Sequence, residues 1–313
     1  MCTAIAYKAD SFYFGRNLDY ERGFGEQIVI TPRNYEFNMR SGIKMESHYA
    51  MIGVATVMDG YPLYYDGLNE KGLCIAGLNF VGNAVYQDEK DGCSNIAQFE
   101  VIPWFLGRCA SVSQMRQLLK ETNITKTQFA DNLPAAQLHW IAADKEECIV
   151  IETTKDGMTV YDNPIGVLTN NPPFPIQLFS LNNYIKLSPK NPKSADWSGQ
   201  ELAAYSRGMG AMGLPGDLSS QSRFIRASFV KKCLICEEGS SAVNQFFHML
   251  DSVKQVRGCC ITDDGEYEYT LYSSCGDADK GIYHITTYDD RSIRSFDMNS
   301  ADLSGEDLFV YNF

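Results

Sequence analysis

The sequence predicts an α+β protein built mainly from antiparallel sheets. Segments with strand character dominate both ends and the middle of the chain, helical segments are fewer, and the two kinds do not alternate as parallel βαβ units require. With 313 residues, 44% of them hydrophobic, the chain can build a sizeable core. Neither a linker nor an internal repeat divides it. We therefore predict a single domain over residues 1–313, with helices covering two sheets.

The predicted strands are β-branched or aromatic runs that turn-forming residues bound. Two runs near the N-terminus, 3–7 and 12–15, indicate a hairpin with its turn at 8–11. Further strands are predicted at 27–31, 49–57, 73–80, 138–144, 148–154 and 158–162. Near the C-terminus, 267–275, 281–288 and 292–298 indicate a meander.

Three segments have helical periodicity: 111–122, 221–236 and 241–253. Ser111 can cap the first of them, because serine is a preferred residue before a helix. The most apolar helix candidate, 96–110, contains Glu100, Pro103 and Arg108. No apolar run approaches the roughly 20 residues that a membrane span needs.

Charge and composition exclude some function classes. The formal net charge of -12 comes from scattered acidic residues and argues against a nucleic-acid surface, which needs a basic patch. The N-terminus has neither a basic region nor a long apolar stretch, so no signal peptide is predicted and we expect a cytoplasmic protein. Most of the ten cysteines should be small buried hydrophobic residues rather than disulfide partners.

Two short motifs are predicted to be structural. GMGAMG at 208–213 matches the dinucleotide pattern, but loop-forming residues flank it where a strand and a helix are required. Cys233 and Cys236 form a CxxC with Cys259 and Cys260 downstream, which a zinc site could use. Because the pair is predicted one turn apart on an apolar helix without a nearby histidine, core packing is favoured. We expect neither a metal nor a cofactor.

The chain has four histidines and no GxSxG motif. Spacing alone does not exclude a Cys–His pair, since the partner can come from anywhere in the chain. His139 lies in a predicted strand and His248 in a predicted helix, both in apolar settings. We therefore expect core or surface histidines at these positions.

The most informative residue is Cys2. It can be a small buried residue at the start of an edge strand. Alternatively, removal of Met1 gives it a free α-amine with a reference pKa of about 7.7–8.0, which can act as base for its own thiol. Arg16 and Asp19 follow on the second strand of the predicted hairpin. There an arginine can favour the thiolate and a carboxylate can orient the amine.

Several segments together resemble one family: MCTAIAY, FGRNLDYE, ITPRNY, YPLYYDGLNEKGL, AGLNF, GVLTNNP, GLPGDLSSQSRF and the C-terminal KGIYHITTY. They are similar to choloylglycine hydrolases, the N-terminal-nucleophile amidohydrolases that comprise bile salt hydrolases and penicillin V acylases. The resemblance runs colinearly through nearly the whole chain. It implies a four-layer αββα fold, a homotetramer and autocatalytic exposure of Cys2 as the nucleophile.

The resemblance also implies roles for other residues. Asn79 matches the position whose backbone N–H lines the oxyanion hole, Asn170 matches the side-chain donor, and Arg223 completes the polar shell with Arg16 and Asp19. Asn171 stands where the family more often has serine, so either amide could serve. Asn79 favours bile salt hydrolases, while penicillin V acylase stays the alternative. A catalytically silent steroid-binding protein is less favoured, because binding does not need an N-terminal thiol.

A steroid substrate needs a broad apolar wall. Leu18, Tyr20, Tyr65, Phe129 and Leu133 lie around the matched motifs and can provide it, although ordinary loop packing explains each equally well. Arg207 precedes GLPGD and is predicted to contact the glycine or taurine anion, giving a modest taurine preference. It can equally be a solvated loop charge.

Overall fold

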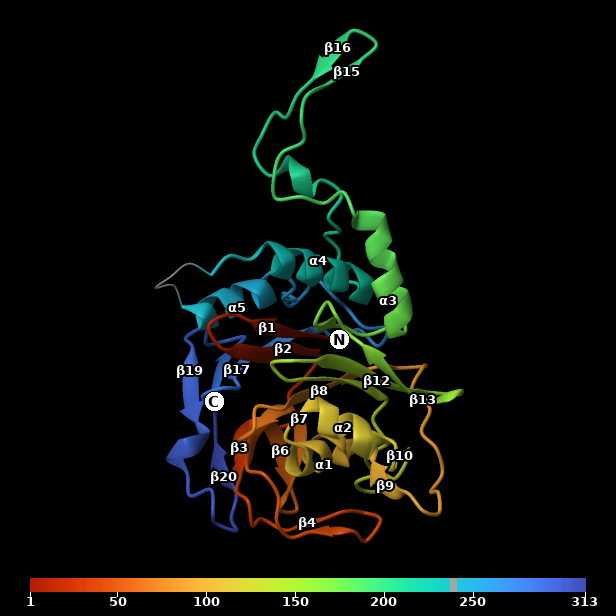
Figure 1. Cartoon of the computed structure of the whole chain (residues 1–313), viewed down its shortest axis with the longest axis vertical. Helices are drawn as coiled ribbons and strands as arrows, with labels where there is room; N and C mark the ends of the chain where they lie inside the picture. Colours follow the sequence, from red (N-terminus) through yellow and green to blue (C-terminus); the bar gives the residue numbers. More distant parts are fainter. Residues whose placement is uncertain (237–240) are drawn as a thin grey trace.

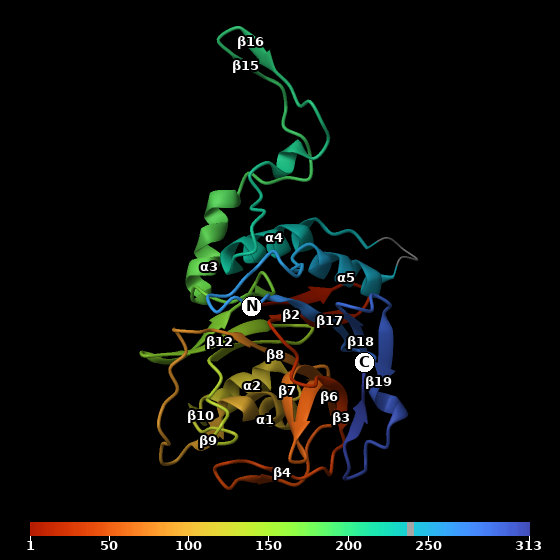
Figure 2. The ribbon, with the colours of Figure 1, turned by 180° about the vertical axis from the view of Figure 1, so that it is seen from behind.

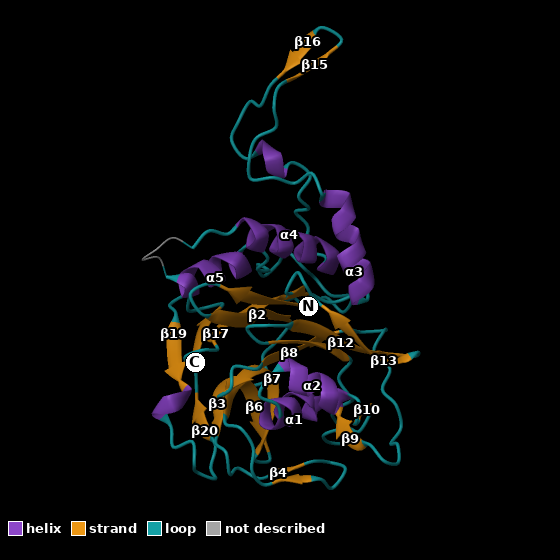
Figure 3. Ribbon diagram, viewed as in Figure 1, coloured by secondary structure: helices purple, strands orange, loops and turns teal. Residues whose placement is uncertain are grey.

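The computed structural model describes residues 1–236 and 241–313. Two antiparallel sheets lie face to face, with helices outside each of them (Figure 1, Figure 3). The predicted four-layer αββα arrangement is therefore confirmed.

The first sheet carries the N-terminal hairpin. Its strand order is β14 (Val167–Leu168), β1 (Cys2–Lys8), β2 (Phe12–Tyr20), β17 (Tyr269–Asp277), β18 (Ile282–Thr287) and β19 (Arg294–Asp297). Gly15 allows β17 to approach β2, because a Cβ at this position would lie 1.9 Å from the Ser274 carbonyl oxygen. Strands β2 and β17 therefore lie close together next to the residues that follow Gly15.

The second sheet follows the order β13 (Gly157–Asp162), β12 (Cys148–Thr154), β11 (Leu138–Ala143), β8 (Cys74–Asn79), β7 (Tyr61–Asn69), β6 (Met51–Met58), β3 (Gln27–Thr31) and β20 (Phe309–Tyr311). Shorter pairs are β4 (Phe37–Asn38) with β5 (Lys44–Met45), β9 (Ser94–Ala97) with β10 (Thr122–Thr125), and β15 (Ala195–Trp197) with β16 (Gln200–Leu202).

Helices cover the outer faces of both sheets. The helices α4 (Ser220–Cys233) and α5 (Ala242–Asp251) pack on the first sheet, and α1 (Val101–Arg108) packs on the second beside α2 (Val112–Leu119). The helix α3 (Phe174–Ser180) contacts α4. Short 3-10 helices span Gln98–Glu100, Leu181–Tyr184, Met209–Ala211 and Met298–Ser300. One apolar core fills the space between the sheets and under α4 and α5, and a second lies under α1 and α2.

The predicted elements agree with the structure except at a few ends. Ser111 caps α2, as expected, by accepting a hydrogen bond from Gln114 N–H. The prediction that Cys233 and Cys236 lie one turn apart on a helix is wrong, because α4 ends at Cys233 and Leu234 turns to extended geometry. Cys236 packs against the core between the sheets, which fits the packing role predicted for it.

Residues 185–213 extend from the layers as an arm (Figure 1; seen from behind in Figure 2). The GMGAMG segment lies at the base of this arm, with Gly208 in the left-handed region at φ 85° and a single 3-10 turn after it. The predicted loop character of this segment is confirmed.

Candidate active site

The N-terminal hairpin brings a thiol and a guanidinium together. In the β1–β2 register Cys2 lies opposite Leu18, and Ala4 lies opposite Arg16. Arg16 Nη2 donates a hydrogen bond to Cys2 Sγ at 2.6 Å. Both side chains are buried, at 2% and 1% exposure. The guanidinium therefore contacts the sulfur atom directly in a buried setting.

Backbone carbonyl groups of the second sheet fix the Arg16 side chain. Its Nη1 donates to the Gly77 carbonyl at 2.6 Å and to the Tyr65 carbonyl at 3.1 Å. Burial lowers the pKa of Arg16, but the negative charges of Cys2 and of nearby buried groups such as Asp66 outweigh it, so that the pKa is raised. Arg16 is therefore a fixed positive charge between the two sheets.

Asp19 lies deeper and accepts hydrogen bonds at both of its oxygens. Thr270 Oγ1 donates to Oδ1 at 2.6 Å, and Gln255 Nε2 donates to Oδ2 at 3.3 Å. Arg223 Nη1 lies 3.9 Å from Oδ2, so the two buried charges compensate each other. Burial lowers the pKa of Arg223, and the charges of Asp19 and Cys2 oppose that shift.

Asn170 links β1 to α4 and to β8 of the second sheet. Its Oδ1 accepts from the Cys2 backbone N–H and from Arg223 Nη2, each at 2.8 Å. Its Nδ2 donates to the Asn79 carbonyl at 2.8 Å. Arg223 Nη1 donates to the Cys2 carbonyl. The structure thus brings together all six residues predicted for catalysis: Cys2, Arg16, Asp19, Asn79, Asn170 and Arg223.

With Met1 present, the chain terminus occupies its own small site. The Met1 ammonium donates to Glu268 Oε1 at 2.6 Å and to the Asp19 carbonyl at 2.7 Å. Burial raises the pKa of Glu268, and the Met1 ammonium opposes that shift. Glu268 was not among the predicted site residues, and its only signal in the sequence is that it is an acidic residue in a predicted strand of apolar and hydroxyl residues.

Cys2 lies at the wall of a mainly apolar cavity of about 280 Å³. Leu18, Tyr20, Tyr65, Phe129 and Leu133, all predicted for the substrate wall, line it. Other apolar residues that line the cavity were not predicted: Phe24, Met58, Leu63, Phe99, Ile102, Pro134, Ala136, Leu138 and Trp140. These come from strands, loops and helices far apart in sequence, and no local pattern marks them as one surface.

The structure does not bring Arg207 to this cavity. Arg207 lies in the arm, is exposed, and is absent from the lining of the cavity that contains Cys2. A contact between Arg207 and a substrate bound at Cys2 of the same chain is therefore not supported.

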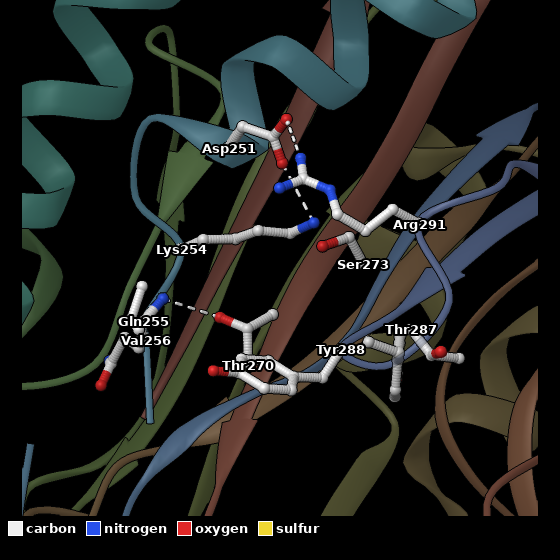
Figure 4. Close-up of a pocket in the computed structure, with 10 residues that line it drawn as sticks. Asp251, Lys254, Gln255, Val256, Thr270, Ser273, Thr287, Tyr288 and Arg291 are labelled. Atoms are coloured by element: carbon white, nitrogen blue, oxygen red, sulfur yellow. Dashed lines mark hydrogen bonds and ion pairs between the residues drawn. The ribbon is translucent and has the colours of Figure 1, made fainter. Parts of the chain in front are cut away.

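A second cleft, of about 460 Å³, lies where the end of α5 meets β17 and β18 (Figure 4). Asp251 forms ion pairs there with Lys254 at 3.0 Å and with Arg291 at 3.1 Å. Cys2 does not line this cleft, but Thr270 and Gln255 do, and both bond Asp19. The wall of this cleft therefore includes two hydrogen-bond donors to the Asp19 carboxylate.

The histidines do not approach the thiol. None of the four, all within the described residues, lines the cavity at Cys2. His139 is fully buried and hydrogen-bonded at both ring nitrogens, and His248 is exposed on α5. The expected core and surface settings are confirmed, and the structure shows no Cys–His pair at Cys2 among residues 1–236 and 241–313.

Neither a metal-binding cluster nor a membrane-spanning helix occurs in the described part of the chain. Within it, no group of three or more His, Cys, Asp or Glu side chains is arranged to hold a metal ion. Its helices are also too short or too polar for any to cross a membrane.

Known proteins resemble this chain over its full length. Residues 2–311 match the model for linear amide C–N hydrolases of the choloylglycine hydrolase family. A bile salt hydrolase/transferase of Lactiplantibacillus plantarum is 50% identical over 312 residues, or 99% of this chain and 96% of the relative. A bile salt hydrolase/transferase of Clostridium perfringens is 38% identical over 319 residues, or 100% and 97%.

Solved structures agree with these matches. A conjugated bile acid hydrolase from Clostridium perfringens has a TM-score of 0.95 at 36% identity, covering 100% of this chain and 97% of that one. A penicillin V acylase from Agrobacterium tumefaciens has a TM-score of 0.78 at 20% identity, covering 99% and 90%, and shares the fold. The resemblance predicted from sequence motifs is confirmed, and the chain belongs to the choloylglycine hydrolase family of linear amide C–N hydrolases.

Proposed function

We propose that this chain hydrolyses the amide bond of glycine- or taurine-conjugated bile salts and releases the bile acid and the amino acid. The position of Cys2 carries the proposal, because its thiol contacts the Arg16 guanidinium at the wall of an apolar cavity. Relatives named as bile salt or conjugated bile acid hydrolases support this substrate class.

In the proposed reaction, removal of Met1 makes Cys2 the first residue. Its free α-amine takes the thiol proton, and Sγ attacks the amide carbon of the substrate. The tetrahedral intermediate collapses when that proton passes to the leaving nitrogen, which departs as glycine or taurine. Water then attacks the acyl thioester, loses a proton to the same amine, and releases the bile acid as the thiol is restored.

We propose that the Asn79 N–H and the Asn170 side-chain amide stabilise the oxyanion of this intermediate. Consecutive residues of an antiparallel strand bond neighbours on opposite sides, and Phe80 N–H donates to the Gln137 carbonyl on the β11 side. Asn79 therefore faces the other way, where its carbonyl accepts from Asn170 Nδ2. An amide nitrogen has two N–H donors, so the second one of Asn170 can serve the oxyanion.

A comparison of substrates tests the proposal. Values of kcat/KM for taurocholate, glycocholate and penicillin V should rank both bile salts above the penicillin, because Asn79 and the aromatic rim of the cavity favour a steroid. A higher value for penicillin V would overturn the substrate class and leave the mechanism intact. Binding of bile salts without turnover would instead indicate a steroid-binding protein.

We also propose a homotetramer. The arm carries large apolar side chains in water, such as Trp197 at 72% and Tyr205 at 83% exposure. Large apolar side chains exposed on a projecting segment are typical of protein interfaces. Cytoplasmic location stays a prediction.

A further inference from the structure

A buried histidine–carboxylate pair lies between the two sheets, close to the proposed oxyanion donors. The register of β11 and β12 places Trp140 opposite Ile151, and therefore His139 opposite Glu152. His139 Nδ1 lies 3.1 Å from Glu152 Oε1, and both side chains are at most 1% exposed. The proposed mechanism gives neither residue a role.

The pair holds the segment that carries Asn170 at two points. His139 Nε2 lies 2.9 Å from the carbonyl oxygen of Thr169, and because a carbonyl only accepts, Nε2 is the donor of this hydrogen bond. Glu152 Oε1 accepts from the Phe174 N–H at 2.9 Å. Asn170 therefore lies between two anchored positions of the chain.

The same imidazole contacts the strand that carries the other proposed donor. Its ring is stacked on Phe80, with centroids 4.3 Å apart and an interplanar angle of 6°. Phe80 directly follows Asn79, and Asn79 pairs with Leu138, which precedes His139. One ring thus contacts the neighbour of Asn79 on one side and the neighbour of Asn170 on another.

We propose that His139, held by Glu152, positions the two donors of the oxyanion hole relative to each other. This inference rests on the proposed roles of Asn79 and Asn170. His139 does not line the cavity and does not touch Cys2, so it acts through Phe80 and the Thr169 carbonyl as a positioning residue. Misplacing a catalytic group by about 1 Å can cost about 10²-fold in rate, so the alignment matters.

Two substitutions of His139 separate this role from simple core packing. An Asn side chain places its amide near the position of Nδ1, whereas a Gln side chain places its amide near Nε2 and can still donate to Thr169. We expect His139→Asn to lower kcat about 10- to 100-fold with KM changed less than about threefold. His139→Gln should recover most of that loss. The control His248→Asn, at an exposed position on α5, should behave as wild type.

The alkylation rate of Cys2 by iodoacetamide, measured on the mature enzyme, provides the second readout. Alkylation reports the thiol and Arg16 but forms no oxyanion, so the His139→Asn rate should stay within about twofold of wild type. A rate that falls in proportion to kcat, or a Gln variant no better than the Asn variant, would overturn the inference. If His139→Asn does not fold, Phe80→Leu is measured instead, because it removes the ring stacking and keeps the hydrogen bond to Thr169. In this variant kcat must still fall by a larger factor than the rate of Cys2 alkylation.

The Asn170→Ala variant separates this inference from the proposed function. A wild-type kcat in Asn170→Ala would reject the oxyanion assignment itself, and with it the role of His139. A loss of about 10²–10³ in Asn170→Ala, with His139→Asn within about threefold of wild type, would reject only the positioning role.

Discussion

At the scale of single residues, the state of the Cys2 nitrogen decides whether the site can react. While Met1 is attached, this nitrogen is a peptide amide that donates to Asn170 Oδ1, and an amide is not a base. The α-amine of the chain then belongs to Met1, which is paired with Glu268. The thiol and its guanidinium partner are in place before the base exists.

We therefore expect a protein that retains Met1, or carries an N-terminal tag, to have no measurable turnover while it keeps the fold. Removal of Met1 should restore activity, because the α-amine of Cys2 becomes available as the base. Mass spectrometry of the N-terminus together with a bile salt hydrolysis assay checks this. Normal turnover by protein with an intact Met1 would contradict the self-base mechanism.

The adjacent amides of Asn170 and Asn171 provide a matched pair of variants. Asn170→Ala should lower kcat about 10²–10³-fold with little change in KM, as is typical when an oxyanion donor is lost. Asn171 donates to the Val81 carbonyl and accepts from Asn83 at the surface, so Asn171→Ala should stay close to wild type. Steady-state kinetics of both variants decide which amide serves the site, and the reverse ranking would move the assignment by one residue.

The sequence predicted the six polar residues at the centre of the site but not the residues that hydrogen-bond to them. Cys2, Arg16 and Asp19 follow from a hairpin, whose alternation and short turn are local features. Thr270 and Glu268 reach the site only through the pairing of β17 with β2. Such a contact across more than 240 residues leaves no periodic signal in one sequence.

At the scale of elements, most of the long strands were predicted, because β-branched and aromatic runs bounded by turns are local signals. The long strand β7 and the short strands β4, β5, β9, β10, β14, β15, β16 and β20 were missed. The helix α3 was missed, since Pro173 and Pro175 flank its start and the element has only 7 residues. The end of α4 was misplaced because its apolar periodicity continues past Cys233, whereas Leu234 leaves the helix to pack on the core.

The segment between β3 and β6 contains a buried histidine, His48, that is hydrogen-bonded to backbone carbonyl groups. His48 is 7% exposed, and its ring nitrogens lie 2.8 Å and 2.9 Å from the carbonyls of Tyr49 and Tyr35. Burial lowers the pKa of His48, although the two carbonyls and Glu70 oppose the shift. The pKa of His48 is therefore lower in the folded than in the unfolded protein. Its contribution to the free energy of unfolding is present above about pH 6.5 and is lost as the pH falls through the folded pKa.

We therefore expect the free energy of unfolding to fall more steeply on acidification in wild type than in His48→Gln. The difference in slope can reach about 1.4 kcal/mol per pH unit for one titrating group. Urea unfolding at about pH 7.5 and about pH 5 measures it. Equal slopes in the two proteins would show that another group controls the acid transition.

At the scale of the whole molecule, the arm is the one described segment that projects well beyond the four packed layers. Its hairpin β15–β16 projects beyond α3 and α4 (Figure 1). The apolar side chains of the arm, such as Trp197 and Tyr205, are exposed. We expect Trp197→Ser combined with Tyr205→Ser to shift the assembly to smaller species in light scattering, while the circular dichroism spectrum stays unchanged. Val310→Ser, at a 41% exposed apolar position on β20 outside the arm, is the control. An unchanged mass in the arm variant would reject the arm as the interface.

The predicted taurine preference depends on the arm, because the arm carries Arg207. Since Arg207 lies outside the cavity of its own chain, it can contact a substrate anion only if assembly brings it to another copy. We then expect Arg207→Gly to lower the ratio of kcat/KM for taurocholate over glycocholate by at most about tenfold, which corresponds to about 1.4 kcal/mol. The arm variant, once dissociated, should show the same ratio as Arg207→Gly. If Arg207→Gly leaves the ratio of the assembled enzyme unchanged, Arg207 is a solvated charge and the cavity wall alone sets the preference.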